Sequence, residues 1–478
     1  MNVLLINPPR FKGIPVIRED RCEIVERNSI LPPYSLAQLA SVLRINNHDV
    51  TLIDANCLNI SVNHLKEEVN RGKFDICIFR FTPITLREDM VIAKICKESH
   101  SIRTVGICWT LRNFSHEVLK NTKDLDIYII DEPLIVIPQL IDKFNNHEPL
   151  ENAKGIAFRE NGRIISTNRS MDDFNYDDMP LPAFDLLPPL EKYYVKSKHV
   201  SPYSIIQTSK GCPFRCIYCT MAKTKWNPRS SAKIFQELEY LKNEHKVNTI
   251  SFFDETFTLD RKRVVDICNK ILENKLKINW HCNTRTNTVD LELLKLMKEA
   301  GCRGISFGIE SGNQQLLDFI KKGTTVDQNE KAISYAKSAG IKTYCSFVFG
   351  FPGEDGQTVK DTLSFVKRTL PNGAQFNMAV PYPGTELFEL AIRNEWIPKE
   401  IDWNNLFQHR SIMHTENLTI GELDHIRKIA YRSLYLNPKW VIMNLRWLFH
   451  EPNDLPIAID YYLNSLINFF IYNMKHAH

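Results

Sequence analysis

Short apolar runs alternate with amphipathic segments over the first part of the chain. Runs at 3–6, 50–55, 75–81, 104–108 and 126–130 have the length of buried strands. After the first run, Leu36, Leu39, Ala40 and Leu43 fall on one helical face behind Ser35, a plausible N-cap. This alternation predicts a doubly wound, Rossmann-like parallel sheet over residues 1–150.

Residues 151–200 have the pattern of a connector. Two short apolar segments, 155–159 and 163–167, flank Asn161-Gly162 and predict a small hairpin. The stretch 179–189 that follows is rich in proline, which prevents a regular helix and favours an extended linker.

A second alternating series runs from 201 to 390. The predicted strands are 205–208, 249–253, 278–283, 304–309, 343–349 and 375–380, and the predicted helices are 231–244, 261–274, 290–299, 326–338 and 357–369. Two helices end in Ala-Gly, at Gly301 and Gly340, where glycine suits a left-handed C-cap. Six strand–helix units predict a partial (β/α)6 barrel, whose chemistry is expected at the C-terminal ends of the strands.

The remaining region, 391–478, is predicted to be mostly helical and is rich in aromatic residues. Its segment 461–472 is amphipathic and too short to span a bilayer. Packing on the barrel is the main interpretation, and contact with a lipid-like substrate or a membrane surface is the alternative.

Charge and composition narrow the function. The 60 basic and 56 acidic residues give a net charge of only +4, without a long basic run, so nucleic-acid binding has no electrostatic support. The apolar run at 3–6 is too short for a signal peptide, and no transmembrane stretch occurs, which predicts a cytoplasmic protein. The first strand-to-helix turn lacks Gly-x-Gly-x-x-Gly, which disfavours a dinucleotide cofactor.

Three cysteines, Cys212, Cys216 and Cys219, form a Cys-x3-Cys-x2-Cys triplet. A structural zinc site usually needs four ligands, and no second pair follows. A disulfide framework is not expected in a long chain without a secretory signal. Three thiolates on one loop can hold three irons of a 4Fe-4S cluster and leave the fourth iron open. The other nine cysteines are scattered and are expected in the core.

With Tyr218 before its third cysteine, the triplet resembles the signature of the radical S-adenosylmethionine (SAM) enzymes. The resemblance implies that Cys212, Cys216 and Cys219 are the cluster ligands and that the open iron chelates SAM. It also implies an electron donor such as flavodoxin or ferredoxin. The electron cleaves SAM to a 5′-deoxyadenosyl radical.

Further segments at predicted strand ends are similar to the SAM-binding segments of that family. By this resemblance Asp254 and Glu255 face the SAM amino group, although a solvent-facing turn with an N-cap role is the alternative. Glu310 and Ser311 belong to the ribose-contacting segment, in which Gly308 and Gly312 let the backbone approach closely.

Three other positions complete this set. Arg285 is expected to meet the SAM carboxylate or to pair with Glu310, with a structural salt bridge as the alternative. Gly350 lies in a segment that resembles the one beside adenine, and Tyr382 is a candidate for substrate contact.

The N-terminal sheet, proline-rich connector and barrel together resemble the cobalamin-binding-domain class of radical SAM enzymes. That resemblance implies cobalamin at the C-terminal edge of the first sheet, with its upper face toward the cluster. The residues expected at its face are Asn7, Pro8, Arg80, Thr82 and Trp109. The chain departs from the pattern in lacking Asp-x-His-x-x-Gly, in reading Gly-Ile-Cys-Trp-Thr at 106–110 instead of paired glycines, and in having Asp-Glu-Pro at 131–133.

The leading hypothesis is methylation of an unactivated carbon of a small molecule or lipid, a substrate class reached by elimination. One alternative is cyclisation, ring rearrangement, oxidation or carbon–carbon coupling without methyl transfer. Another is a radical enzyme whose first domain is a substrate or partner platform without cobalamin. An iron–sulfur regulator is the non-enzyme alternative, which the SAM-pocket segments disfavour.

Overall fold

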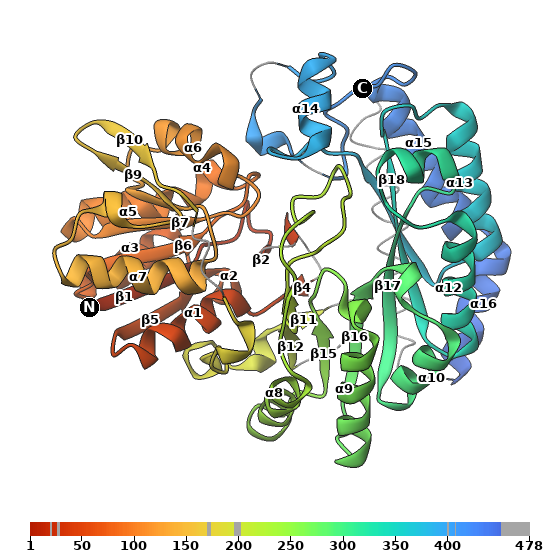
Figure 1. The fold of residues 1–478 in the computed structure, drawn as a ribbon, viewed down its shortest axis with the longest axis horizontal. Coiled ribbons are helices and arrows are strands. Elements are labelled where there is room, and N and C mark those ends of the chain that lie inside the picture. The colour runs from red at the N-terminus through yellow and green to blue at the C-terminus, as the bar shows by residue number, and fades with distance from the viewer. Residues whose placement is uncertain are drawn as a thin grey trace.

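The computed structural model describes residues 1–19, 22–25, 29–169, 174–195, 202–398, 401–406 and 408–450. Two mainly parallel sheets, each covered by helices, lie side by side along the longest axis of the molecule (Figure 1). The first sheet comes from the N-terminal part of the chain, and the second comes from the region beyond residue 202. The α/β fold class that the sequence predicted is thus confirmed.

The first sheet contains five parallel strands near the predicted positions. They are β1 (Asn2–Asn7), β5 (Asp49–Asp54), β6 (Ile76–Arg80), β7 (Arg103–Ile107) and β8 (Ile127–Ile129). Their spatial order, β5-β1-β6-β7-β8, is the 2-1-3-4-5 order of a common doubly wound fold. In such sheets ligands bind outside the carboxyl ends of the strands, at the point where the order reverses, which here lies between β1 and β6.

The sheet continues beyond residue 150. The hairpin predicted in the connector consists of β9 (Ile156–Glu160) and β10 (Arg163–Ser166), and β9 pairs antiparallel with β8. The hairpin therefore forms one edge of the first sheet, a placement that its turn signal alone does not predict.

Helices cover both faces of the first sheet, as the two-residue period of a strand requires. Val3 and Leu5 of β1 share one core with α1 (Tyr34–Ile45) and α7 (Pro133–Asn145). On the opposite face lie α3 (Val62–Arg71), α5 (Val91–His100) and α6 (Ser115–Asn121), which pack on Leu4 and Ile6.

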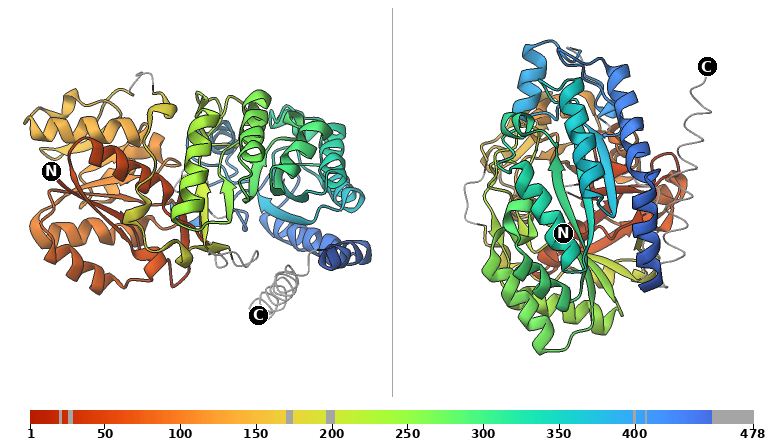
Figure 2. Two further views of the ribbon diagram at one scale, coloured as in Figure 1. Left: turned by 90° about the horizontal axis from the view of Figure 1, so that it is seen from below. Right: turned by 90° about the vertical axis from the view of Figure 1, so that its right-hand side faces the viewer.

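The second sheet has six parallel strands in sequential order. They are β12 (Tyr203–Ile206), β15 (Thr249–Phe252), β16 (Asn279–Thr284), β17 (Cys302–Glu310), β18 (Lys342–Phe349) and β19 (Gly373–Met378). Between them run α8 (Ser231–Glu244), α9 (Arg261–Glu273), α10 (Leu291–Glu299), α11 (Gln314–Phe319), α12 (Val326–Ser338) and α13 (Gly356–Thr369). Figure 2 shows the helices outside the curved sheet, as in a partial barrel. Gly301 and Gly340 both have positive φ angles, as predicted.

The C-terminal region contains α14 (Glu386–Arg393), α15 (Ile420–Tyr435) and α16 (Pro438–His450). The Tyr435 hydroxyl lies 3.0 Å from both the amide nitrogen and the carbonyl oxygen of Ala374. Because these groups belong to the edge strand β19, α15 covers an edge that would otherwise be open to pairing. None of the described helices is both long and apolar enough to cross a membrane. The predicted amphipathic segment 461–472 lies outside the described residues.

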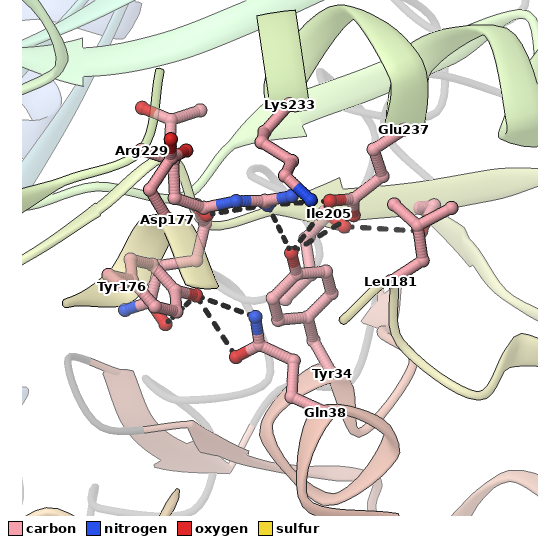
Figure 3. Close-up of polar contacts among 12 residues, drawn as sticks. Tyr34, Gln38, Tyr176, Asp177, Leu181, Ile205, Arg229, Lys233 and Glu237 are labelled. Atoms are coloured by element: carbon pink, nitrogen blue, oxygen red, sulfur yellow. Dashed lines mark hydrogen bonds and ion pairs between the residues drawn. The ribbon is translucent and has the colours of Figure 1, made fainter. Parts of the chain in front are cut away.

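A buried polar cluster joins the two units (Figure 3). Tyr34 of α1 donates a 3.0 Å hydrogen bond to Glu237 of α8, and Arg229 contacts the same carboxylate at 2.6 Å. Beside it, Gln38 of α1 donates to the hydroxyl of Tyr176 at 2.7 Å. These contacts link α1, which packs on the first sheet, to α8 of the second unit and to Tyr176 of the connector.

Candidate active site

The cysteine triplet lies on a compact loop after β12. The backbone of Cys212 accepts a hydrogen bond from Thr224 at 3.1 Å, and the Phe214 carbonyl accepts one from Lys223 at 2.8 Å. A β-carbon on Gly211, whose φ is +86°, would lie 2.0 Å from the Lys225 carbonyl oxygen. Glycine is therefore required at the start of this loop.

The three thiols lie close to one another and to two charged side chains. Arg285 donates a hydrogen bond to the sulfur of Cys216 at 3.6 Å and stacks over the ring of Phe214 at 3.7 Å. Burial raises the pKa of Cys212, and the nearby carboxylate of Glu255 raises it further. Burial also raises the pKa of Cys219 to about 12.

This donor set fits an iron–sulfur cluster. Positive iron would offset the burial that raises the pKa of Cys212 and Cys219, and the backbone amides of Phe214 and Met221 point at the sulfurs of these two residues. Within the described ranges, no three His, Cys, Asp or Glu side chains are grouped to hold a single metal ion. In a cubane the three sulfurs would bind three different irons.

Of the two carboxylates predicted to face the SAM amino group, one is used in hydrogen bonds within the protein. Asp254 is buried and accepts hydrogen bonds from the backbone amide and hydroxyl of Thr208 and from Ser209 at 2.8 Å. It thereby ties β15 to the residues that lead into the cysteine loop. Glu255 is half-buried and lies near Cys212, so it is the better placed of the two to meet a ligand.

Glu310 lies at the C-terminal end of β17, where the pairing register with β18 shifts. Its backbone has a φ of +67°, which is uncommon for a residue with a side chain and frequent at functional sites. Its buried carboxylate accepts a 2.7 Å bond from the ammonium of Lys322, itself buried. A β-carbon on Gly308 would lie 2.6 Å from the Glu310 carboxylate and 2.8 Å from the Lys322 ammonium, so a side chain there would displace the pair.

Lys322 was not predicted. Among the described contacts it is Lys322, rather than Arg285, that pairs with Glu310, while Arg285 donates to the Lys322 carbonyl oxygen. Tyr218 joins this group, since burial and then the Glu310 carboxylate raise its pKa well above the usual value. The hydroxyl of Ser311 lies 3.2 Å from that of Thr362 on α13.

Gly350, predicted near adenine, directly follows β18 and has a φ of +88°. Its amide donates to a carboxyl oxygen of Glu354, a side chain with no solvent-exposed surface. Burial raises the pKa of Glu354 to about 8. The carboxyl group is therefore protonated in the folded protein at neutral pH.

This raised pKa predicts a pH dependence of stability. The protonated Glu354 side chain contributes its full stabilisation of the folded state below the ordinary pKa of 4.5. This contribution is lost as the pH rises through about 8, because the carboxyl group must then ionise in a buried site. Between those pH values the free energy of unfolding should fall by on the order of 4 kcal/mol. Urea unfolding of Glu354→Gln should show a flatter profile, whereas Glu299→Gln, at an exposed position, should keep the wild-type slope. Equal slopes for all three proteins would contradict the assignment.

Four of the five residues predicted to contact cobalamin are buried at the C-terminal ends of β1 and β6: Asn7, Pro8, Arg80 and Thr82. Asn7 donates to Asp54 at 2.8 Å, and Arg80 donates to the hydroxyl of Ser35 at 3.1 Å. Trp109, after β7, is half-buried, and its indole nitrogen has no hydrogen-bond acceptor among the described residues.

A short strand closes the crevice between β1 and β6. Arg18 of β2 (Val16–Glu19) forms a buried ion pair with Asp89 at 2.7 Å and donates to the carbonyl oxygens of Pro8 and Pro9. A small cavity lined in part by Asn7, Arg18 and Arg80 remains under this strand. Beyond this crevice along the same sheet edge, Trp109 follows β7, the strand next to β6.

The Trp109 end of this sheet edge meets the cysteine loop. Lys210, two residues before Cys212, pairs with Glu132 after β8 at 2.7 Å. Arg112, after β7, stacks on Trp109 at 3.9 Å and donates to the carbonyl oxygen of Thr220, which follows Cys219, at 3.1 Å. Both ends of the cysteine loop are therefore held by the C-terminal edge of the first sheet. Tyr382, the predicted substrate contact, is half-buried after β19 and accepts a hydrogen bond from Gln408 at 3.2 Å.

Comparison with known proteins agrees with this arrangement. The model of the radical SAM superfamily matches residues 206–366. An uncharacterized methyltransferase from Pyrococcus horikoshii is 31% identical over 449 residues, which cover 93% of this chain and 95% of that protein. The anaerobic magnesium-protoporphyrin IX monomethyl ester cyclase of Cereibacter sphaeroides is 28% identical over 433 residues, covering 88% of this chain and 68% of the cyclase.

Two solved structures share the fold at low sequence identity. The radical SAM methyltransferase TsrM from Kitasatospora setae, with cobalamin and a [4Fe-4S] cluster bound, has a TM-score of 0.68 at 15% identity and covers 84% of this chain and 76% of its own. The cobalamin-dependent radical enzyme OxsB, with aqua-cobalamin and SAM bound, has a TM-score of 0.73 at 18% identity. The match covers 100% of this chain and 75% of the OxsB chain. The chain therefore belongs to the radical SAM superfamily of enzymes, in the same family as the Pyrococcus horikoshii methyltransferase.

Proposed function

We propose that this enzyme is a cobalamin-dependent radical SAM methyltransferase that acts on an unactivated carbon of a small-molecule or lipid substrate. The observation that carries the proposal is the junction at which the edge of the first sheet holds both ends of the cysteine loop, through Glu132 and Arg112. A cofactor on that edge would face a cluster on the loop. When bound, the cluster supplies the electron that cleaves SAM, and cobalamin supplies the methyl group.

The residues of the chain have separate tasks in this proposal. Cys212, Cys216 and Cys219 hold three irons, and Arg285 donates a hydrogen bond to the ligand sulfur of Cys216. Glu255 meets the ammonium of SAM, and Glu310, oriented by Lys322, accepts the ribose hydroxyls.

Trp109 is the residue of the first sheet best placed to contact cobalamin. Its indole N–H is buried without an acceptor among the described residues, which is the property expected of a donor to a bound group. The buried Asn7 and Arg80 instead hold the strand ends that shape this edge, through hydrogen bonds to Asp54 and Ser35.

Radical cyclisation without methyl transfer is the second candidate. It is favoured by the similarity to the Cereibacter sphaeroides cyclase over 88% of this chain. Methyl transfer ranks first because the Pyrococcus horikoshii relative is more similar and matches over 95% of its length.

An anaerobic reconstitution tests the proposal. The purified chain is loaded with iron, sulfide and hydroxocobalamin, desalted, and analysed for metals. It is then incubated with dithionite, methyl-deuterated SAM and a small-molecule extract of the source organism. We expect about four irons and one cobalt per chain, together with 5′-deoxyadenosine, S-adenosylhomocysteine and a deuteromethylated product. Iron and 5′-deoxyadenosine without retained cobalt or labelled product would overturn methyl transfer and favour the second candidate.

A further inference from the structure

The two faces of the second sheet differ in polarity. Side chains alternate along a strand, and the helices lie outside the curved sheet (Figure 2), so one set of positions on β16–β19 faces the helices and the other faces inward. Cys282, Phe307 and Phe347 belong to the first set and are buried in the apolar core. From the middle of the strands onward, the inward set includes four polar side chains, which we call the inner polar group: Asn283, Ser306, Ser346 and Asn377.

The side chains of the inner polar group lie close together and are half-buried. Asn283 is the register partner of Ser306 on the neighbouring strand, and the Asn377 amide donates a 3.3 Å hydrogen bond to the Ser346 hydroxyl. The side chains of Asn283 and Ser306 have no hydrogen-bond partner among the residues that the structure describes. Both therefore keep a donor and an acceptor for a ligand.

The inner polar group lies beside the residues proposed to bind SAM. Asn283 is two residues before Arg285, a separation of about 7 Å along an extended strand. Ser346 is the register partner of Gly308, and the space beside Gly308 is occupied by the Glu310 carboxylate and its lysine partner. A radical formed from SAM reacts with a carbon in contact with it, so a substrate on the inner polar group would lie next to that radical.

We propose that the inner polar group binds the substrate, and that the substrate is a water-soluble molecule with hydroxyl or amide groups near the reacting carbon rather than a lipid. The proposal rests on the function proposed above and narrows its substrate class. The four side chains offer amide and hydroxyl donors and acceptors and carry no charge. They therefore match a neutral hydrogen-bonding group better than a carboxylate or a phosphate.

The cost of covering polar groups is the reason for excluding a lipid. An acyl chain or a flat apolar ring on this face would remove the amide of Asn283 and the hydroxyl of Ser306 from water without giving them partners, which is unfavourable. A molecule with matching groups completes those hydrogen bonds. A site built in this way rejects analogues that lack the matching groups.

Two substitutions remove hydrogen-bonding groups from this face while keeping or reducing side-chain volume. Asn283→Leu replaces the amide by an apolar group of similar size, and Ser306→Ala removes the hydroxyl. Asn279→Leu is the matched control, because it makes the same replacement on the same strand at an exposed position at the opposite end of β16.

Two quantities are measured on the anaerobically reconstituted full chain, with the water-soluble and the chloroform-soluble fractions of an extract of the source organism as separate probes. The first is the set of molecules retained in equilibrium dialysis with SAM and no reductant, identified by mass spectrometry. The second is the deuteromethylated product formed from each fraction with dithionite and methyl-deuterated SAM.

We expect the wild-type chain to retain a molecule from the water-soluble fraction and to convert it to the labelled product. Asn283→Leu and Ser306→Ala should each lower the labelled product at limiting extract about tenfold and weaken retention of the same molecule. Iron content and the 5′-deoxyadenosine formed without extract should stay unchanged in both variants. Asn279→Leu should behave as the wild type.

Each other outcome decides the proposal. Retention and labelling from the chloroform-soluble fraction alone would overturn it, as would retention from neither fraction. Unchanged retention and labelling in both variants, or an equal loss in Asn279→Leu, would also overturn it. Loss of 5′-deoxyadenosine without extract would show that the side chains support SAM instead of the substrate. A water-soluble molecule that the wild type retains and Asn283→Leu does not, but that is never methylated, would support the substrate class and count against the proposed methyl transfer.

Discussion

Replacing Cys216 by alanine should leave the reconstituted protein with less than about one iron per chain and reduce 5′-deoxyadenosine formation to the uncatalysed background. Cys216 is the middle ligand of the proposed set, it is 7% exposed, and its sulfur accepts the hydrogen bond from Arg285. Two remaining cysteines on a short loop cannot hold a cubane with an open iron. Iron analysis and the visible spectrum after anaerobic reconstitution measure the first effect, and chromatography measures the second.

The matched control is Cys345→Ala. Cys345 is also a buried free cysteine, but it lies on β18 in the core of the second sheet. Its loss should cost packing energy only, with iron content and SAM cleavage retained. A Cys216→Ala protein that keeps about four irons and cleaves SAM at the wild-type rate would remove the triplet from the cluster site. Loss of iron in Cys345→Ala as well would show that general instability, rather than ligation, is being measured.

The arrangement of strands and helices could be predicted because the apolar pattern of each element depends on which of its faces are buried. Strands buried on both faces are continuously apolar, as at β1, and the helices between them show a period of 3.6 residues. The two Ala-Gly ends were predictable for the same local reason, since only the C-cap geometry decides them. The role of the cysteine loop was predicted from the resemblance of its Cys-x3-Cys-x2-Cys spacing, with Tyr218, to the radical SAM signature.

The partners of charged side chains could not be predicted, because they come from distant parts of the chain. Lys322 follows α11 with no pattern around it, and the turn of the chain through α11 returns it to Glu310, 12 residues earlier. No sequence pattern around Arg18 predicts its position either, yet it lies in the crevice where the sheet topology predicts a ligand. Asp254 shows the converse. Its place at a strand end led to the prediction that it binds a ligand, but its carboxylate accepts a hydrogen bond from Thr208 instead.

The junction between the two units should be the most sensitive place to a single charge deletion. Arg229 and Glu237 form an ion pair with side chains 1% and 0% exposed, and Tyr34 donates to the same carboxylate. Arg229→Met would leave Glu237 charged and buried without its cation. Breaking a buried pair in this way typically destabilises a protein by about 3–5 kcal/mol.

Denaturation in urea, followed by fluorescence and circular dichroism, measures this loss. Tyr34→Phe is the matched control, because it removes only the hydrogen bonds that the Tyr34 hydroxyl makes with Glu237 and Arg229 and keeps the ion pair, so a loss of about 1–2 kcal/mol is expected. The double variant Arg229→Met with Glu237→Leu removes both charges, so it should recover most of the stability that Arg229→Met loses.

The double variant also separates stability from orientation. In it the Glu237 carboxylate that Tyr34 and Arg229 share is gone, so no directional contact of this cluster joins α1 to α8. If these bonds set the orientation of the first sheet, the stable double variant should still cleave SAM but form less methylated product per 5′-deoxyadenosine. A double variant as unstable as Arg229→Met would show that the site cannot accept apolar side chains. Full stability in Arg229→Met itself would show that the pair is not buried in solution.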